Sequence, residues 1–236
     1  MTTSRSLDIG RFDVLTFDCY GTLIDWEAGI LAGLRVVLDA RGIETTDDQL
    51  LEAFAHHEAE LEAGPYLRYR EVLAGCLRAL CAAHGVTPSH DEEADFAGSV
   101  RDWRPFPDSP AALARLATRF RLGVITNCDD DLFAASERRL GINFDWVVTA
   151  QQLGSYKPNP RNIELALERI GVPRDRVLHV AQSLFHDHVP AKALGLSTVW
   201  VDRRHDRPGS GATLPASAKP DLVVPDMRTL AELAVP

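Results

Sequence analysis

The stretch that decides the fold is VLTFDCYGTLIDW, residues 14–26. It begins with apolar and β-branched residues, which favour a buried strand, and it places one carboxylate, Asp18, directly before a Gly-Thr turn. Tyr20 follows two positions later. Ligand sites of open α/β sheets lie at the carboxyl ends of the strands, so Asp18 is a candidate functional residue.

Six short, mostly buried strands are predicted in all, at residues 12–18, 121–126, 146–149, 177–181, 198–201 and 222–224. Helical patterns between them cover residues 110–120, 130–140 and 161–170, and Gly171 marks the end of the last one. Strands that alternate with helices predict an α/β fold with a parallel sheet covered on both faces.

Residues 26–103 break this alternation. They show four helix-like stretches, at residues 27–41, 46–62, 69–84 and 91–103, with no strand pattern among them. We therefore predict an all-helical insert at 26–103 and a core made of residues 1–25 and 104–236. The segment 207–220 is rich in Gly, Ser and Pro and is predicted to be a surface loop.

Composition restricts the partners. The chain has 236 residues and a net charge of −9, which argues against nucleic acid or an anionic membrane as the main partner. The four cysteines follow neither zinc nor disulfide spacing, which favours reduced thiols. The first residues, MTTSRSLDIGRFD, lack the apolar run of a signal peptide, and no apolar stretch reaches spanning length. We expect a cytoplasmic protein.

Polar groups follow four of the predicted strands, and parallel strands bring such groups to one edge of the sheet. They are Asp18, the pair Thr126 and Asn127, Lys157, and Ser183 with Asp187. A lysine beside a carboxylate is expected to lower the pKa of that carboxyl and to orient it. An oriented carboxylate in a desolvated site is a competent nucleophile.

These motifs resemble those of the haloacid dehalogenase superfamily, in the order Asp-x-x-Gly-Thr, Thr-Asn, Lys-Pro and a late Asp. The resemblance covers essentially the whole chain. It implies a three-layer, Rossmann-like parallel-sheet core, a helical cap inserted after the first strand, and Asp18 as the nucleophile.

Tyr20 separates two branches of that superfamily. Its phosphatases carry Asp-x-Asp, in which the second acid protonates a basic alkoxide, whereas a halide leaves unaided. Tyrosine has a high pKa and is a poor general acid at neutral pH. DCYGT resembles the Asp-x-Tyr-Gly-Thr of the L-2-haloacid dehalogenases. The acid pair spaced four apart that helps phosphatases bind Mg²⁺ falls here on Ser183 and Asp187, so one carboxylate is missing. Both departures imply a hydrolase that needs no metal and no cofactor.

The resemblance implies a two-step mechanism on short L-2-haloacids, including haloacetate. Asp18 displaces the halide from C2 with inversion, and water then attacks the ester carbonyl of Asp18 and releases a 2-hydroxy acid. Asp187 would place that water and pair with Lys157. Ser183 belongs to the same catalytic group, and Thr22 would hydrogen-bond Asp18.

The remaining candidates bind substrate. Tyr20 would line the pocket, and Thr126 and Asn127 would contact the substrate carboxylate or the halide. In the family a cap arginine assists the halide, and Arg70 and Arg68 in PYLRYREVL are the candidates here. His186 stands where these dehalogenases have a pocket tryptophan. Leu184 stands in the place of their asparagine, a departure that affects water positioning.

Two other functions stay open. A Mg²⁺-dependent phosphatase acting on a small metabolite would explain Asp187, with Mg²⁺ bound by Asp18, the Tyr20 carbonyl and Asp187. A non-catalytic protein that binds small acids would explain Gln182 and Leu184. The apolar insert helices would also permit a homodimer.

Overall fold

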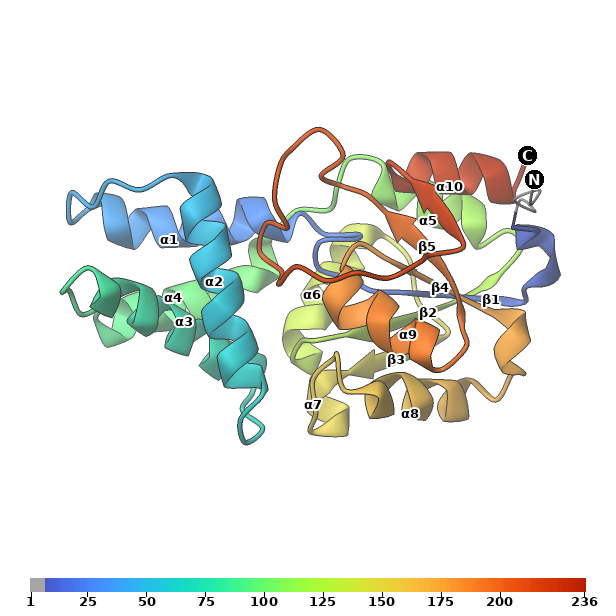
Figure 1. Ribbon diagram of the computed structural model, residues 1–236, viewed down its shortest axis with the longest axis horizontal. Coiled ribbons are helices and arrows are strands. Elements are labelled where there is room, and N and C mark those ends of the chain that lie inside the picture. Colours follow the sequence, from blue (N-terminus) through green and yellow to red (C-terminus); the bar gives the residue numbers. More distant parts are fainter. Residues whose placement is uncertain (1–6) are drawn as a thin grey trace.

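The sheet of the computed structural model, which describes residues 7–236, consists of six parallel strands in the order β3-β2-β1-β4-β5-β6 (Figure 1). Residues 1–6, the first part of the segment considered for a signal peptide, lie outside the described residues. The strands are β1 (Val14–Phe17), β2 (Arg121–Thr126), β3 (Trp146–Thr149), β4 (Val177–Ala181), β5 (Ser197–Val201) and β6 (Leu222–Val224). The predicted α/β fold with a parallel sheet is confirmed.

Strand β1 lies in the centre of the sheet, and this position determines where Asp18 lies. Phe17 is paired with Val124 of β2 on one side and with Val180 of β4 on the other. All four residues of β1 are buried, as expected for a strand with both faces covered. Asp18 therefore follows the central strand, between the ends of β2 and β4.

Helices cover both faces of the sheet, as Figure 1 shows with α5 and α10 above it and α8 below it. These flanking helices are α5 (Ser109–Leu116), α6 (Asp130–Leu140), α7 (Ala150–Leu153), α8 (Pro160–Ile170), α9 (Val189–Ala193) and α10 (Met227–Ala234). Because side chains alternate along a strand, β1 contributes to two cores. Val14 packs with Ile163 of α8, whereas Leu15 packs in the larger core with Leu113 of α5 and Leu230 of α10.

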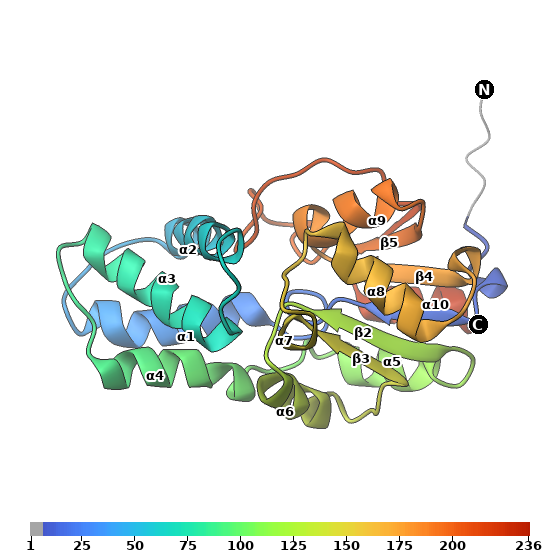
Figure 2. The same cartoon turned by 90° about the horizontal axis from the view of Figure 1, so that it is seen from below.

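The segment between β1 and β2, which we call the helical insert, lies beside the sheet (Figure 2). It contains α1 (Trp26–Asp39), α2 (Asp47–Glu62), α3 (Tyr69–Ala83), α4 (His90–Gly98) and a 3₁₀ turn (Ser99–Asp102). Capping boxes fix two of the helix starts, with Thr46 and Gln49 at α2 and Ser89 and Glu92 at α4. Among the helices of residues 7–236, none has the length and apolar character required to cross a membrane.

Several boundaries differ from the predictions for physical reasons. The helix predicted at 110–120 ends at Leu116, and the one predicted at 91–103 ends at Gly98 and continues as a 3₁₀ turn. Helices α7, α9 and α10 were not predicted, since they have four, five and eight residues and little helical periodicity can be read from so few. The segment 207–220 is a loop, but Ala212 and Thr213 in it are buried.

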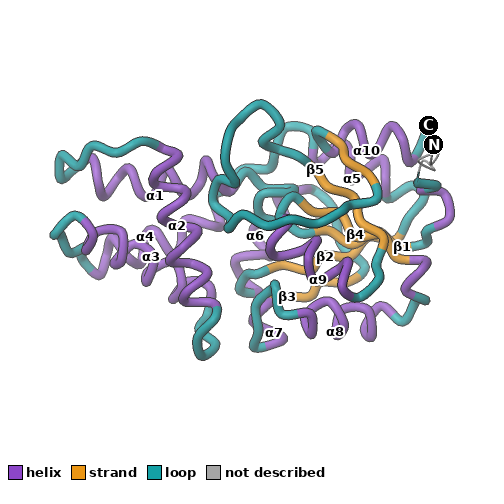
Figure 3. The backbone as a smooth tube through the Cα atoms, viewed as in Figure 1, coloured by secondary structure: helices purple, strands orange, loops and turns teal. Residues whose placement is uncertain are grey.

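That loop, between β5 and β6, extends from the core to the insert (Figure 3). The Arg204 Nη1 atom lies 2.6 Å from Glu27 Oε2 in the first turn of α1, and both side chains are buried. The backbone N–H of Ala212 donates to Glu27 Oε1 at 3.2 Å. The chain enters and leaves the insert side by side, because Ile24 forms a bridge with Pro105.

Candidate active site

Asp18 lies at the wall of a cavity between the carboxyl edge of the sheet and the insert. Its backbone N–H donates to the Val180 carbonyl at 3.1 Å, which prolongs the pairing of β1 with β4 by one bond. Thr22 donates its hydroxyl to Asp18 Oδ2 at 2.7 Å. The turn between Asp18 and Thr22 needs Gly21, because its φ of +91° is unfavourable for other residues. A Cβ added at this position would also lie only 2.8 Å from Trp26 Nε1.

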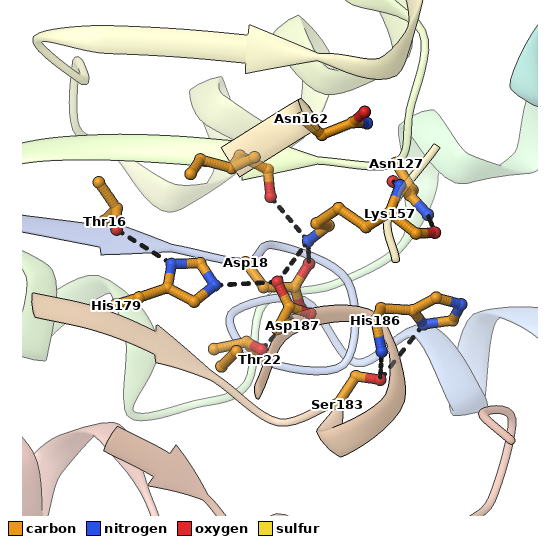
Figure 4. Close-up of polar contacts among 12 residues, drawn as sticks. Thr16, Asp18, Thr22, Asn127, Lys157, Asn162, His179, Ser183, His186 and Asp187 are labelled. Atoms are coloured by element: carbon orange, nitrogen blue, oxygen red, sulfur yellow. Dashed lines mark hydrogen bonds and ion pairs between the residues drawn. The ribbon is translucent and has the colours of Figure 1, made fainter. Parts of the chain in front are cut away.

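Lys157 joins the two candidate carboxylates (Figure 4). Its Nζ lies 2.9 Å from Asp18 Oδ1, 2.7 Å from Asp187 Oδ1 and 2.9 Å from the Ile125 carbonyl oxygen, which accounts for all three ammonium hydrogens. Asn127 holds the backbone of Lys157 in place. Its Oδ1 accepts from the Lys157 N–H at 2.8 Å, and its Nδ2 donates to the Lys157 carbonyl at 2.9 Å.

Asp187 is oriented by a second, buried partner that sequence reasoning missed. It lies in a π-helical turn (Leu184–His188) after β4, and its Oδ1 is 2.9 Å from His179 Nε2. The other ring nitrogen of His179 is 3.0 Å from the Thr16 hydroxyl. The signal was a polar residue in the middle of an otherwise apolar strand, VLHVA. Asp187 Oδ2 is buried and has no hydrogen-bond partner within residues 7–236.

Burial and neighbouring charges shift the pKa values of Asp18 and Asp187 in opposite directions. Burial raises the pKa of Asp18 above its ordinary value, and Lys157 only partly opposes this. Burial also acts on Asp187, but there Lys157 and His179 outweigh it and lower the pKa of that carboxyl. Burial alone would lower the pKa of Lys157, but the two carboxylates outweigh it and raise that pKa. Lys157 therefore lowers the pKa of both carboxyls, as expected, but at Asp18 desolvation is the larger effect and leaves the pKa raised.

Three predicted residues lie on the cavity wall around this group: Ser183, His186 and Asn127. Ser183 Oγ accepts from the His186 backbone N–H at 3.0 Å and lies 3.2 Å from His186 Nδ1 and 3.0 Å from the Thr213 hydroxyl. Burial lowers the pKa of His186 to about 4, so its ring is neutral at pH 7. His186 therefore offers the cavity a neutral ring nitrogen, Nε2, which is buried and unpartnered within the described chain.

Tyr20 and Thr126 differ in their relation to the cavity. Tyr20 lines it, but its hydroxyl lies 3.0 Å from Ser136 Oγ and accepts from Cys128 Sγ at 3.4 Å in the core. Burial raises the pKa of this phenol well above its ordinary value, so it cannot act as an acid at neutral pH. Thr126 is buried at the end of β2 and does not line the cavity.

The two arginines expected at the halide do not line this cavity either. Arg70 instead pairs with Asp129 at 3.0 Å and with Asp131 at 2.6 Å, so it joins α3 to the start of α6. Arg68 is exposed and precedes α3. The physical reason is that α3 presents Tyr69, the residue between the two arginines, to the cavity.

The insert contributes acids instead. Glu58 and Glu62 of α2 line the cavity together with Trp26 and Tyr69. Sequence reasoning missed these acids, although the pattern contained a signal. The buried residues Leu50 and Phe54 recur every four positions along α2, and Glu58 and Glu62 continue the same stripe.

The cavity is small and has a larger neighbour. Its volume is about 20 Å³, room for about one water molecule. A groove of about 460 Å³ shares Glu62 and Lys157 with it and is also lined by Tyr66, Tyr156 and Phe185. The rings of Tyr66 and Tyr156 stack with their centroids 5.5 Å apart.

The polar groups could offer only part of a Mg²⁺ site. Asp18 and the unpartnered Oδ2 of Asp187 are oxygen ligands of the kind that Mg²⁺ prefers. Ser183 supplies a hydroxyl where a further carboxylate would be needed. Within residues 7–236 no cluster of three or more His, Cys, Asp or Glu side chains is arranged to hold a metal.

Comparison with known proteins identifies similar chains. The family model described as haloacid dehalogenase-like hydrolase matches residues 12–194. An (S)-2-haloacid dehalogenase of Pseudomonas putida is 24% identical over 93% of this chain and 94% of that protein. A glyceraldehyde 3-phosphate phosphatase of Methanothermobacter thermautotrophicus is 31% identical over 72% of this chain and 75% of that protein. The structure of L-2-haloacid dehalogenase from Xanthobacter autotrophicus is similar, with a TM-score of 0.77, 23% identity and coverage of 94% of this chain and 98% of that one.

Proposed function

Because this chain belongs to the haloacid dehalogenase-like hydrolase family, we propose that it hydrolyses the carbon–halogen bond of short L-2-haloacids through an ester on Asp18. The observation that carries this proposal is the state of Asp18. It is a buried carboxylate on the cavity wall, oriented by Lys157 and Thr22, while the hydroxyl of Tyr20, two residues later, is occupied in the core. Such a site has a nucleophile, Asp18, but no proton donor at position 20, and a halide is a leaving group that needs no proton.

In the first step an Asp18 carboxylate oxygen attacks C2 of the substrate. The new C–O bond forms as the C–halogen bond breaks, and the bonding electron pair leaves with the halogen as halide. Lys157 remains bound to the aspartyl group and to Asp187 throughout. The Asn127 amide group, which now donates to Glu62 at 3.2 Å, is the group that would take an oxygen of the substrate carboxylate.

In the second step water attacks the carbonyl carbon of the aspartyl ester. Asp187 Oδ2, which is buried and unpartnered in the described chain, accepts an O–H of that water and places it. The alkoxide of the product takes one proton, and the second proton is released to solvent. The Asp18 carboxylate is restored. In this scheme residues 26–103 act as the cap that closes the cavity, and no step requires a metal ion or cofactor.

One observation favours a second candidate, a Mg²⁺-dependent phosphatase. Asp187 Oδ2 is free of protein partners in the part of the chain described, as a metal ligand would be, and one relative is named a phosphatase. Against it stand Ser183 in place of a carboxylate and Tyr20 in place of an acid.

The two candidates separate in one assay. Halide release from L-2-chloropropionate and fluoroacetate, and phosphate release from a panel of phosphate esters, are each measured with EDTA and with Mg²⁺. Halide release in EDTA supports the proposal. Phosphate release that requires Mg²⁺, without halide release, would instead identify a phosphatase.

A labelling experiment tests the intermediate. A single turnover in H₂¹⁸O should place ¹⁸O in the side chain of Asp18, because water attacks the ester carbonyl. Asp18→Asn should abolish turnover while the far-UV circular dichroism stays unchanged. Label found only in the product would show that water attacks the substrate directly and would contradict the ester.

A further inference from the structure

The feature that the proposed function leaves unexplained is the pair of acids on the insert side of the cavity. Glu58 and Glu62 are four residues apart on α2 and both line the cavity that contains Asp18. Tyr69 donates its hydroxyl to Glu58 at 2.9 Å, and Asn127 donates to Glu62. Neither acid has a lysine or arginine ion-pair partner in the described part of the chain.

The charges around the cavity cannot all be present together. Asp18, Asp187, Glu58 and Glu62 are four carboxyls around one ammonium, that of Lys157. Burial raises the pKa of Glu58 to about 8, and burial followed by repulsion from Glu58 raises the pKa of Glu62 well above its ordinary value. Glu58 is therefore a carboxylic acid at neutral pH, and burial favours the same neutral form for Glu62; a carboxyl in that form has an O–H to donate.

A second observation on the same wall is a ring nitrogen, His186 Nε2, that has no hydrogen-bond partner among the described residues. His186 Nε2 lies 3.8 Å from Glu62 Oε2, beyond hydrogen-bond distance. It is buried and without a partner among the described residues, and its side chain lines the cavity. A small group bound between Glu62 and His186 would complete the polar contacts of this wall.

We propose that Glu62 is a catalytic hydrogen-bond donor of this site, with its carboxyl O–H directed at the departing halogen on the insert side of the cavity. This inference rests on the proposed function and deepens it. Asp18 belongs to the core and Glu62 to the insert, so the two groups reach the cavity from different parts of the chain, and inversion at C2 needs attack and departure on opposite sides of that carbon. As the C–halogen bond breaks, its electron pair passes to the halogen, and the Glu62 O–H forms a hydrogen bond to the developing halide. Glu58, four residues earlier on the same helix, lines the same cavity and adds to the burial that raises the pKa of Glu62.

Leaving groups should differ in how much they gain from this donor. Fluoride is a stronger base and a stronger hydrogen-bond acceptor than chloride, so it gains more from a donor. A donor aimed at charge that develops in the transition state contributes on the order of 100-fold to the rate.

The sign of the pH dependence follows from the neutral form. Glu62 donates below its pKa and loses the hydrogen as pH rises through that value, so the rate should fall on the alkaline side. The charged or titratable groups that act on the Glu58–Glu62 pair or share its surroundings are Asp18, Tyr69, Cys76, Tyr156, Lys157, His186 and Asp187. Variants of Glu62 itself are needed to separate its titration from theirs.

The test compares Glu62→Gln and Glu62→Ala with the wild type and with Glu60→Gln, a control on the same helix whose side chain is 79% exposed. Fluoride and chloride release are measured from 2-fluoro and 2-chloro acids between about pH 6 and 10. Gln keeps a neutral donor at all pH values, so the alkaline fall should disappear in Glu62→Gln. Glu62→Ala should lose about 100-fold in fluoride release and clearly less in chloride release. A Glu62→Ala variant that matches Glu60→Gln for both halides overturns the inference and leaves the proposed function standing.

A binding measurement covers the case in which no halide is released by any protein. Bromide binding is measured by calorimetry at about pH 6 and pH 9. The wild type should bind bromide about tenfold more weakly at the higher pH, and Glu62→Gln should bind it equally at both. Absent binding, or wild-type binding that does not change with pH, refutes the acid on the insert wall, whereas absent turnover with the expected binding refutes only the haloacid as substrate.

Discussion

Replacing Lys157 by methionine should destabilise the protein strongly and in a pH-dependent way. The lysine side chain is 2% exposed, and its ammonium contacts Asp18, 9% exposed, and Asp187, 1% exposed. Methionine fills much of the same space but leaves both carboxylates buried without a counter-charge.

The magnitude follows from that burial. Removing one partner of a buried ion pair costs about 3–5 kcal/mol. In the wild type the lowered pKa of Asp187 means that the pair stabilises the fold above the ordinary pKa of the carboxyl and ceases to do so as pH falls. In Lys157→Met both carboxyls are expected to titrate at higher pH, so the loss should be largest near about pH 8 and should shrink near about pH 4.

The assay is urea unfolding at several pH values, with Lys192→Met as the control. Lys192 Nζ lies 2.7 Å from Asp221, a comparable distance, but the two side chains are 30% and 36% exposed. Such a pair contributes about 0–1 kcal/mol. If Lys157→Met loses no more stability than Lys192→Met at about pH 8, the carboxylates are not held as a buried charged group and the reasoning fails.

Three further substitutions test other contacts. Tyr20→Phe should lower the free energy of unfolding by about 1 kcal/mol, because the hydrogen bond to Ser136 is lost. Its turnover, measured by steady-state kinetics, should fall far less than the roughly 100-fold that loss of a general acid costs. Arg70→Met should lower the free energy of unfolding by about 2 kcal/mol, because buried Asp129 loses a donor, with an unchanged KM for the haloacid; a raised KM would place Arg70 at the substrate. Glu58→Gln should become more stable relative to the wild type as pH rises from about 5 to 8, by up to about 1.4 kcal/mol per pH unit. The folded wild type still holds a proton that the unfolded chain has lost, so rising pH favours unfolding of the wild type but not of the variant; parallel urea midpoints across that range would refute this.

The core and its polar edge were predictable because a parallel sheet leaves few alternatives. Short buried strands separated by helices place the residues after each strand at one edge. Asp18, Lys157 and Asp187, which are far apart in sequence, meet there as expected. His179 was missed because a single polar residue in a strand does not reveal whether it faces a helix or a catalytic group.

The insert was predictable as helices but not as a binding wall. Which face of a helix meets the core depends on how the helices of the insert pack together, and this packing is not encoded in local periodicity. Arg68 and Arg70 have the charge that a halide would attract, yet α3 presents Tyr69 to the cavity. In the sequence alone, Glu58 and Glu62 look like solvated acids. They are recognised as inward-facing only because they continue the spacing of the buried residues Leu50 and Phe54 along α2.

The buried contact between Arg204 and Glu27 holds the start of the insert against the β5–β6 loop of the core. Glu27 lies in the first turn of α1, and both of its carboxylate oxygens accept hydrogen bonds from the β5–β6 loop. The insert is held to the core at the groove as well, where Tyr66 stacks on Tyr156 and the Tyr156 hydroxyl donates to the Leu67 carbonyl at 2.8 Å. The larger groove shares Glu62 and Lys157 with the small cavity, whereas Asp18 lines only the cavity, so a molecule that follows the groove inward contacts Glu62 before Asp18.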